Sequence, residues 1–172
     1  MMKAEEIKKK LGEHTEFKAW KKDNPESYLA HMFWMNDEAN INVVQIGYCN
    51  KDESITTFFL EKNDIRIATE KEAFKKPEDK ILSLDVSKVN VSQEDAMEKA
   101  AEILREKYKT SAMKSFMILQ KLKEYGQVYN ITFITQSFST LNVKINAETG
   151  EAVKHELASL MDYRQDEPED KK

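Results

Sequence analysis

Short apolar runs separated by polar turns make up most of this 172-residue chain, and they constrain its fold more than any other feature. Between residues 28 and 68 the runs are rich in β-branched and aromatic side chains, whereas residues 141–147 alternate strictly between apolar and polar ones. Both patterns are typical of strands in antiparallel meanders. The sequence therefore predicts strands at 28–35, 41–48, 55–60, 65–68, 128–134, 141–147 and 152–160.

Helical spacing of apolar residues marks two other segments. Residues 3–20 predict one helix, because their apolar side chains fall near one face and the charges lie elsewhere. A second helix is predicted to start after Ser92, whose hydroxyl can cap it, with Asp95 three residues later, and to end near Lys109. Residues 115–122 fit either a helix or a strand.

The order of a helix followed by antiparallel strands occurs twice, and equivalent elements start roughly 88 residues apart. We therefore predict an α+β fold of two tandem units, each a helix packed on an antiparallel β-meander. The predicted divisions are a first unit at 1–70, a linker or connection at 71–91, a second unit at 92–160 and a disordered charged tail at 161–172.

The strands of the first unit are apolar on both sides, as Val43 beside Val44 and Phe58 beside Phe59 illustrate. A strand with two apolar faces is typically buried on both. Its own helix can cover only one face, so the other face needs a second partner. The second unit is one candidate, and a second chain in a homodimer is the other.

Two stretches of the second unit carry a family likeness. They are the capped helix Ser92-x-Glu94-x-Ala96-x-x-x-Ala100 and the hairpin Val143-x-Ile145-Asn146-Ala147-x-Thr149-Gly150-Glu151-x-Val153. Residues 86–158 thereby resemble the PepSY domain, a module of peptidase propeptides and related regulatory proteins. The first unit resembles it by element order only, and Asn146 stands where the family often has Asp. The resemblance implies a non-enzymatic binding module that regulates a peptidase.

Charge and apolar content exclude several classes of function. The chain has 27 Lys and Arg against 31 Asp and Glu, a formal charge of −4, and its basic clusters have acidic neighbours, so we expect no nucleic-acid partner. No apolar run approaches the ~20 residues of a bilayer span, so we expect no membrane partner. The first residues are charged and lack the apolar stretch of a secretory signal, which predicts a cytoplasmic location.

We expect no enzyme, and no catalytic, cofactor or metal site. His14, His31 and His155 do not stand at metal-ligand spacing, and Cys49 has no second cysteine. A Cys49–His31 pair across adjacent strands is one candidate nucleophile, but nothing local in the sequence activates the thiol. A free, partly buried cysteine is the favoured interpretation. The four glycines are isolated, which excludes a Gly-rich phosphate loop.

Aromatic and polar residues of the strands are the candidates for partner binding. An aromatic group could line a groove for a peptide or an apolar ligand, with core packing as the competing interpretation: Trp34, Tyr48, Tyr129 and Phe138. A polar row is either simply solvated or a recognition surface: Asn130, Thr132, Gln136, Asn142 and Lys144.

The predicted function is recognition of a protein or peptide, at a sheet edge or on the concave sheet face, by a module that regulates a peptidase as the resemblance implies. The alternative is a small apolar-ligand binding protein with a cavity between helix and sheet. We expect Phe58, Tyr129 or Phe133 to line such a cavity.

Overall fold

The computed structural model describes residues 2–70 and 80–160. The helices are α1 (Ala4–Glu13), α2 (Thr15–Asp23), the short 3₁₀ helix η1 (Val86–Lys88) and α3 (Gln93–Tyr108). The strands are β1 (Tyr28–Asn36), β2 (Val43–Cys49), β3 (Ile55–Glu61), β4 (Asp64–Glu70), β5 (Ala112–Leu122), β6 (Gly126–Thr135), β7 (Ser139–Asn146) and β8 (Ala152–Ser159). Within the described residues, none of the helices is both long and apolar enough to cross a membrane.

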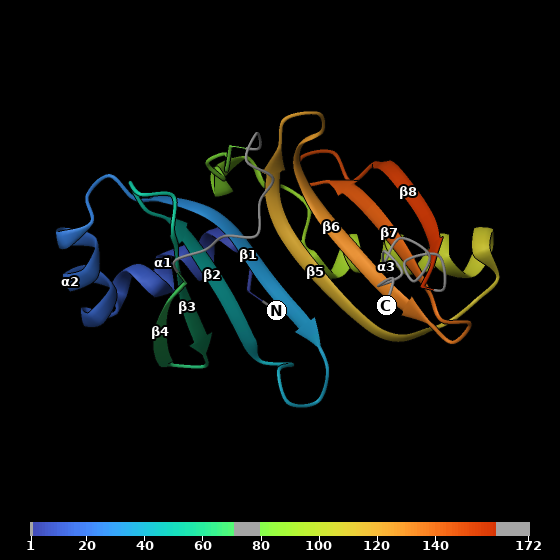
Figure 1. The fold of residues 1–172 in the computed structure, drawn as a ribbon, viewed down its shortest axis with the longest axis horizontal. Helices are drawn as coiled ribbons and strands as arrows, with labels where there is room; N and C mark the ends of the chain where they lie inside the picture. Colours follow the sequence, from blue (N-terminus) through green and yellow to red (C-terminus); the bar gives the residue numbers. More distant parts are fainter. Residues whose placement is uncertain (1, 71–79, 161–172) are drawn as a thin grey trace, which may run out of the picture.

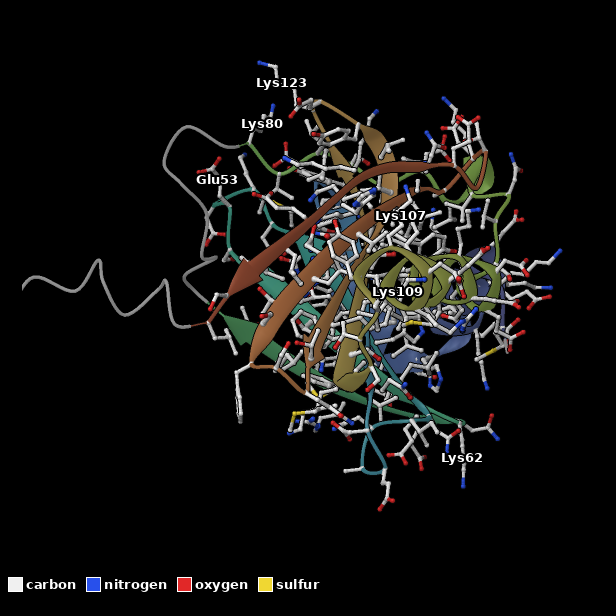
Figure 2. All side chains as sticks on the ribbon, turned by 90° about the vertical axis from the view of Figure 1, so that its right-hand side faces the viewer. Glu53, Lys62, Lys80, Lys107, Lys109 and Lys123 are labelled. Carbon is white, nitrogen blue, oxygen red and sulfur yellow. The ribbon has the colours of Figure 1, made fainter. Side chains whose placement is uncertain are left out.

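All eight strands form one antiparallel sheet in the order β4-β3-β2-β1-β5-β6-β7-β8. The pair β1–β5 lies in the middle, and consecutive strands run outward from it to both edges (Figure 1). Charged residues at the hairpin turns, such as Lys62 and Lys123, project from opposite ends of the sheet (Figure 2). The predicted α+β class with an antiparallel sheet is confirmed.

The helices pack on one face of this sheet, and α1 and α3 lie behind the strands in the view of Figure 1. The strand β7 shows the consequence for burial. Leu141, Val143 and Ile145 point towards the helices and are fully buried, whereas Asn142 and Lys144 point the other way and are half-buried. No helix in the described part of the chain covers this second side, which we call the uncovered face.

The prediction of one helix over 3–20 is wrong, because the chain breaks at His14. His14 has extended backbone angles (φ −72°, ψ 133°) and separates α1 from α2. In a straight helix, Trp20 would lie about 140° around the axis from Ile7, at 100° per residue. The break turns α2 so that Phe17 and Trp20 also reach the sheet, where both pack against Phe58.

The second predicted helix is confirmed, and the ambiguous segment 115–122 is a strand. The backbone N–H of Asp95 donates to the Ser92 hydroxyl at 3.1 Å, which caps α3 as the sequence indicates. Residues 115–122 lie within β5, which is hydrogen-bonded to β1 on one side and to β6 on the other. Pairing on both sides decides the conformation where local propensity does not.

The predicted linker or connection at 71–91 contains η1 in its described part, and that part packs into the core. Leu84 is 3% exposed, and its N–H donates to the Leu29 carbonyl at 2.9 Å. The Gln127 side chain binds the backbone of Asp85 twice, accepting from its N–H and donating to its carbonyl. Ile81 packs against the small cluster of Ala30, Cys49 and Ile55, so this connection supplies part of the second burial partner expected for the first strands. The predicted linker at 71–79 and the tail at 161–172 lie outside the described residues.

A test of the sheet register is available at Gly47, against which the His31 ring packs. A Cβ atom at Gly47 would lie 2.2 Å from His31 Cε1, so Gly47→Ala forces the ring out of its place. We expect Gly47→Ala to lower the free energy of unfolding by about 1–3 kcal/mol, as overpacking does, measured by urea denaturation.

Gly12→Ala is the matched control, because a Cβ at Gly12 meets nothing within 4 Å and alanine favours the helix. In a His31→Ala background the Gly47→Ala substitution should cost much less, since the clashing ring is gone. An equal cost in both backgrounds would contradict the contact.

Candidate recognition surface

One row of residues crosses the uncovered face through all eight strands. Each strand contributes the residue directly opposite its neighbour in the register, and the row runs Arg66, Phe59, Gln45, Phe33, Ile118, Asn130, Lys144 and Lys154. Its middle is apolar, and its two ends are basic. The row therefore has a different chemical character at its centre and at its rims.

At the centre of the row, Phe33 and Ile118 form an apolar strip together with the adjacent Phe116, which we call the central strip. Phe33 lies opposite Ile118 in the β1–β5 pair, and the Phe33 and Phe116 rings are 6.1 Å apart between centroids. All three side chains are half-buried, because neighbouring strands cover their sides but nothing described covers their outer surface. The strip is an apolar surface fixed on rigid backbone.

On one side of the central strip, Arg66 of β4 stacks on Phe59 of β3. The guanidinium carbon lies 4.0 Å from the ring centroid, a close cation–π contact. The two residues are directly opposite each other in the β3–β4 register. The stack holds a permanent positive charge against an aromatic surface.

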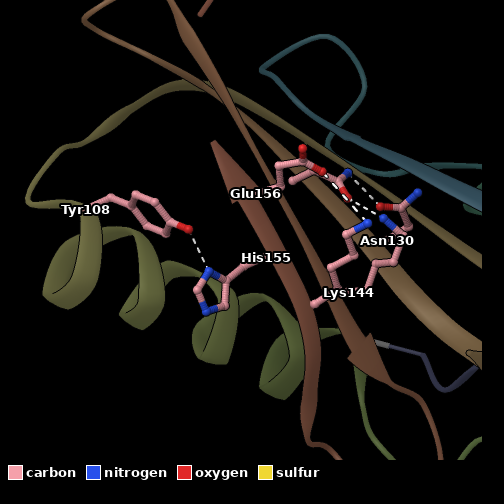
Figure 3. A network of polar contacts seen from close by, with 7 residues as sticks. Tyr108, Asn130, Lys144, His155 and Glu156 are labelled. Carbon is pink, nitrogen blue, oxygen red and sulfur yellow. Dashed lines mark hydrogen bonds and ion pairs between the residues drawn. The ribbon is translucent and has the colours of Figure 1, made fainter. Parts of the chain in front are cut away.

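On the other side of the strip lies a network that we call the polar flank, made by Asn130, Thr132, Asn142 and Lys144. Asn142 Nδ2 donates to Asn130 Oδ1 at 2.6 Å and to Thr132 Oγ1 at 3.1 Å, and Lys144 Nζ donates to Asn142 Oδ1 at 2.6 Å (Figure 3). Burial, and to a lesser extent the charge of Lys154, lower the pKa of Lys144 from its ordinary value. These bonds orient the amides and the ammonium group before any partner arrives.

On the helix side of the sheet, β8 contacts the end of α3. Tyr108 Oη lies 2.6 Å from His155 Nδ1, and their rings meet edge to face (Figure 3). This contact joins the end of α3 to an edge strand. His155 therefore has a structural role in this arrangement.

Cys49 and His31 lie on adjacent strands, but their contacts are with other groups. The Cys49 thiol contacts the Asn50 carbonyl at 3.6 Å, and the His31 ring packs over Gly47. Burial lowers the pKa of His31 from its ordinary 6.5. Among the described residues, no group of three or more His, Cys, Asp or Glu side chains could hold a metal ion.

The structure separates six of the side chains expected to bind a partner, namely Trp34, Tyr48, Tyr129, Thr132, Gln136 and Phe138. Tyr48 is 4% exposed in an aromatic cluster with Phe17 and Phe58, where burial raises its pKa to about 12. Tyr129 is 1% exposed, and its hydroxyl donates to the Val91 carbonyl at 2.8 Å. Both tyrosines belong to the core instead of lining a groove.

The other four candidates lie at three different places. Trp34 is half-buried on the helix side of the sheet, and Thr132 belongs to the polar flank on the uncovered face. Gln136 and Phe138 are exposed in the β6–β7 turn, where Phe138 is 63% exposed with a positive φ of 56°. Of the six, only Thr132 lies in the polar flank, where its neighbours Asn130 and Lys144 are members of the row.

Sequence reasoning missed the apolar members of this surface: Phe33, Phe59, Phe116 and Ile118. Both faces of β1 and β5 carry apolar side chains, so alternation alone does not tell the outward ones from the inward ones. The signal that finds them is the register with the polar residues of β6 and β7. Asn130 lies opposite Ile118, which places Ile118 on the same face.

Comparison with known proteins adds one similarity of fold. No family model matches the chain, and no curated protein matches its sequence. Among solved structures, the chain is similar to the crystal structure of a "putative lipoprotein" from Clostridium difficile 630, with a TM-score of 0.53 and 14% sequence identity. The match covers 83% of this chain and 90% of that one. At this identity the likeness shows the fold alone.

The half-buried His31, packed over Gly47, predicts a contribution to the pH dependence of stability. Its pKa is lowered in the folded protein, so the unfolded chain binds a proton first as the pH falls. Stability is therefore lost as the pH falls below about 6.5, with a slope of at most about 1.4 kcal/mol per pH unit. We expect His31→Gln to reduce this loss, measured by urea denaturation between about pH 7 and about pH 5.

His14→Gln is the control, since it removes a histidine at the α1–α2 break and leaves the Gly47 contact intact. It should keep the slope of the parent protein. The same slope in the parent and in His31→Gln would contradict the assignment.

Proposed function

We propose that this protein is a non-enzymatic binding module that recognises a protein partner through the uncovered face of its sheet. The observation that carries the proposal is the continuous row across eight strands, with an aromatic and apolar centre between polar and basic rims. Protein interfaces share this anatomy, because an apolar centre excludes water while a polar rim contributes hydrogen bonds.

The size of the row supports a macromolecular partner. Eight strands spaced by about 4.8 Å give a row about 34 Å long. A typical interface covers about 800 Å² on each partner, which matches a surface of this width. A small molecule would touch only two or three strands, so a folded protein or a long peptide fits the row better.

Pre-organisation also supports recognition by this face. The central strip lies on paired strands, and the amides of the polar flank are already hydrogen-bonded to one another. Binding then immobilises few side chains that were free before, which lowers its entropic cost. Aromatic residues and arginine, such as Phe33 and Arg66, are the types that contribute most to binding energy at interfaces.

The sheet edges are weaker candidates than the face. The edge strand β4 carries Asp64 and Arg66, and the edge strand β8 carries Lys154 and Glu156. Charged side chains on edge strands disfavour the addition of another strand. We therefore propose the face, and not an added strand, as the recognition surface.

The alternative function, an apolar-ligand carrier, receives no support at its expected cavity. Phe58, Tyr129 and Phe133 are at most 3% exposed and belong to the packed core. A core of close-packed side chains leaves no room for a ligand at these residues.

We also propose that the chain is a tandem of two related units. The supporting observation is that strands leave the central β1–β5 pair in chain order towards both edges, each set preceded by at least one helix. The second unit's resemblance to the PepSY domain makes a peptidase the first partner class to test.

The proposal predicts that contact with the partner centres on the central strip. A photo-reactive benzoylphenylalanine in place of Phe116 should cross-link one partner in the native host, to be identified by mass spectrometry. With that partner purified, Phe33→Ser should weaken binding at least tenfold, about 1.4 kcal/mol, measured by calorimetry.

Leu157 provides the matched control, because it is an exposed apolar residue on the other side of the sheet. The photo-reactive residue at Leu157 should not cross-link the same partner, and Leu157→Ser should leave the affinity unchanged. Thermal melts establish that each variant is folded. If Phe33→Ser and Leu157→Ser weaken binding equally, or neither does, the uncovered face is not the recognition surface.

A further inference from the structure

A separate hollow of about 380 Å³ lies on the helix side of the sheet, between the end of β1, the β1–β2 loop and the start of α3. Its wall is mostly apolar and comes from both halves of the chain: Trp34, Met35, Ile41, Met97, Ala101 and Met117. At the density of a liquid, such a volume holds about twelve non-hydrogen atoms, or about three leucine side chains. It can therefore receive the apolar side chains of a partner.

The apolar surface continues beyond the hollow itself. Met35 and Ile41 line it and are 37% and 65% exposed, so both present large apolar groups to solvent. Adjoining exposed apolar groups mark interaction surfaces. A small molecule inside the hollow would leave these two side chains uncovered, whereas a polypeptide lying across it would cover them. The arrangement therefore favours a polypeptide occupant.

The rim of the hollow is acidic. Among the described residues that line it, Glu94 and Glu98 carry negative charge and none carries positive charge. Both glutamates are exposed, and they stand four residues apart on α3, so they lie on one side of the helix about 6 Å apart along its axis. Lysine or arginine side chains four residues apart on a second helix have the same spacing. A basic helix therefore matches the rim in both charge and period.

The methionines in the wall suit an apolar helix face. Met35, Met97 and Met117 come from β1, α3 and β5. Methionine is unbranched and polarizable, so it adapts to the irregular surface of inserted side chains. Amphipathic helices bind in apolar grooves through anchors that recur every three or four residues. A groove that combines a methionine-rich wall with an acidic rim therefore favours a helix that is both amphipathic and basic.

We propose that this hollow is a docking site for a basic amphipathic helix of a partner protein. Its aliphatic anchors fill the hollow and pack on the methionines and on Ile41, while its lysine or arginine side chains lie beside Glu94 and Glu98. The site lies on the opposite side of the sheet from the central strip. The proposal therefore goes beyond the one made for the uncovered face and does not depend on it.

The first test uses a labelled helical peptide of leucine and lysine, whose leucines recur every three or four residues. Titration with the full chain, followed by fluorescence anisotropy, should show saturable binding. The same peptide with glutamate in place of lysine should bind at least tenfold more weakly. Decylamine, a small cationic amphiphile, should not displace the lysine peptide at equal concentration.

Three results of this titration would overturn the proposal. They are no saturable binding at millimolar protein, equal affinity for the glutamate peptide, and displacement by an equal concentration of decylamine. The last result would favour a small-molecule site instead of a helix.

Matched charge variants test the location of the site. Glu98→Lys should weaken binding of the lysine peptide at least fivefold. Glu102→Lys makes the same change of charge at another exposed position of α3, away from the residues that line the hollow, and should weaken binding less than twofold. Equal effects of the two variants would mean that only the overall charge matters, and would overturn the proposal.

Matched apolar variants complete the test. Ile41→Ser should weaken binding of the lysine peptide at least threefold, whereas Leu157→Ser, at another exposed apolar residue, should leave it unchanged. Phe33→Ser should also leave it unchanged, which separates this site from the uncovered face. Both Ile41 and Leu157 are exposed, so these two substitutions leave the core intact. Unchanged affinity in Ile41→Ser, or weaker binding in Phe33→Ser, would place the peptide elsewhere and overturn the proposal.

Discussion

The pairing of β1 with β5 is the interaction on which the rest of this structure depends. Six consecutive residue pairs, from His31 opposite Gln120 to Asn36 opposite Ser115, join two meanders into one sheet. Because the sheet is continuous, one apolar core extends beneath it from Ala4 to Ala147. The same pairing aligns the side chains of all eight strands into a single row, and it brings Trp34 near the start of α3.

Much of the fold could be predicted from local patterns, and the exceptions have physical causes. The alternation in β6 and β7 and the Ser92 cap depend on neighbouring residues, so the sequence displays them directly. The break at His14 depends on where the sheet lies relative to Phe17, which no local pattern records. The conformation of β5 likewise depends on partners that are distant in sequence.

The binding surfaces were harder to predict than the strands, for a related reason. The polar flank could be recognised because Asn130, Asn142 and Lys144 interrupt apolar positions at every second residue. The aromatic residues gave no such guide, since Tyr48 and Tyr129 resemble Phe33 in sequence context but point into the core. Register between strands decides which aromatic side chains face outward, and register is a property of the assembled sheet.

The continuity of the sheet also bears on how this chain avoids aggregation. Two separate four-stranded meanders would present four open strand edges, each a template for intermolecular β-pairing and fibril growth. Joining them leaves two, β4 and β8. The merger thus removes half of the aggregation-prone boundary, and it does so at β1 and β5, the strands that carry the half-buried apolar side chains of the central strip.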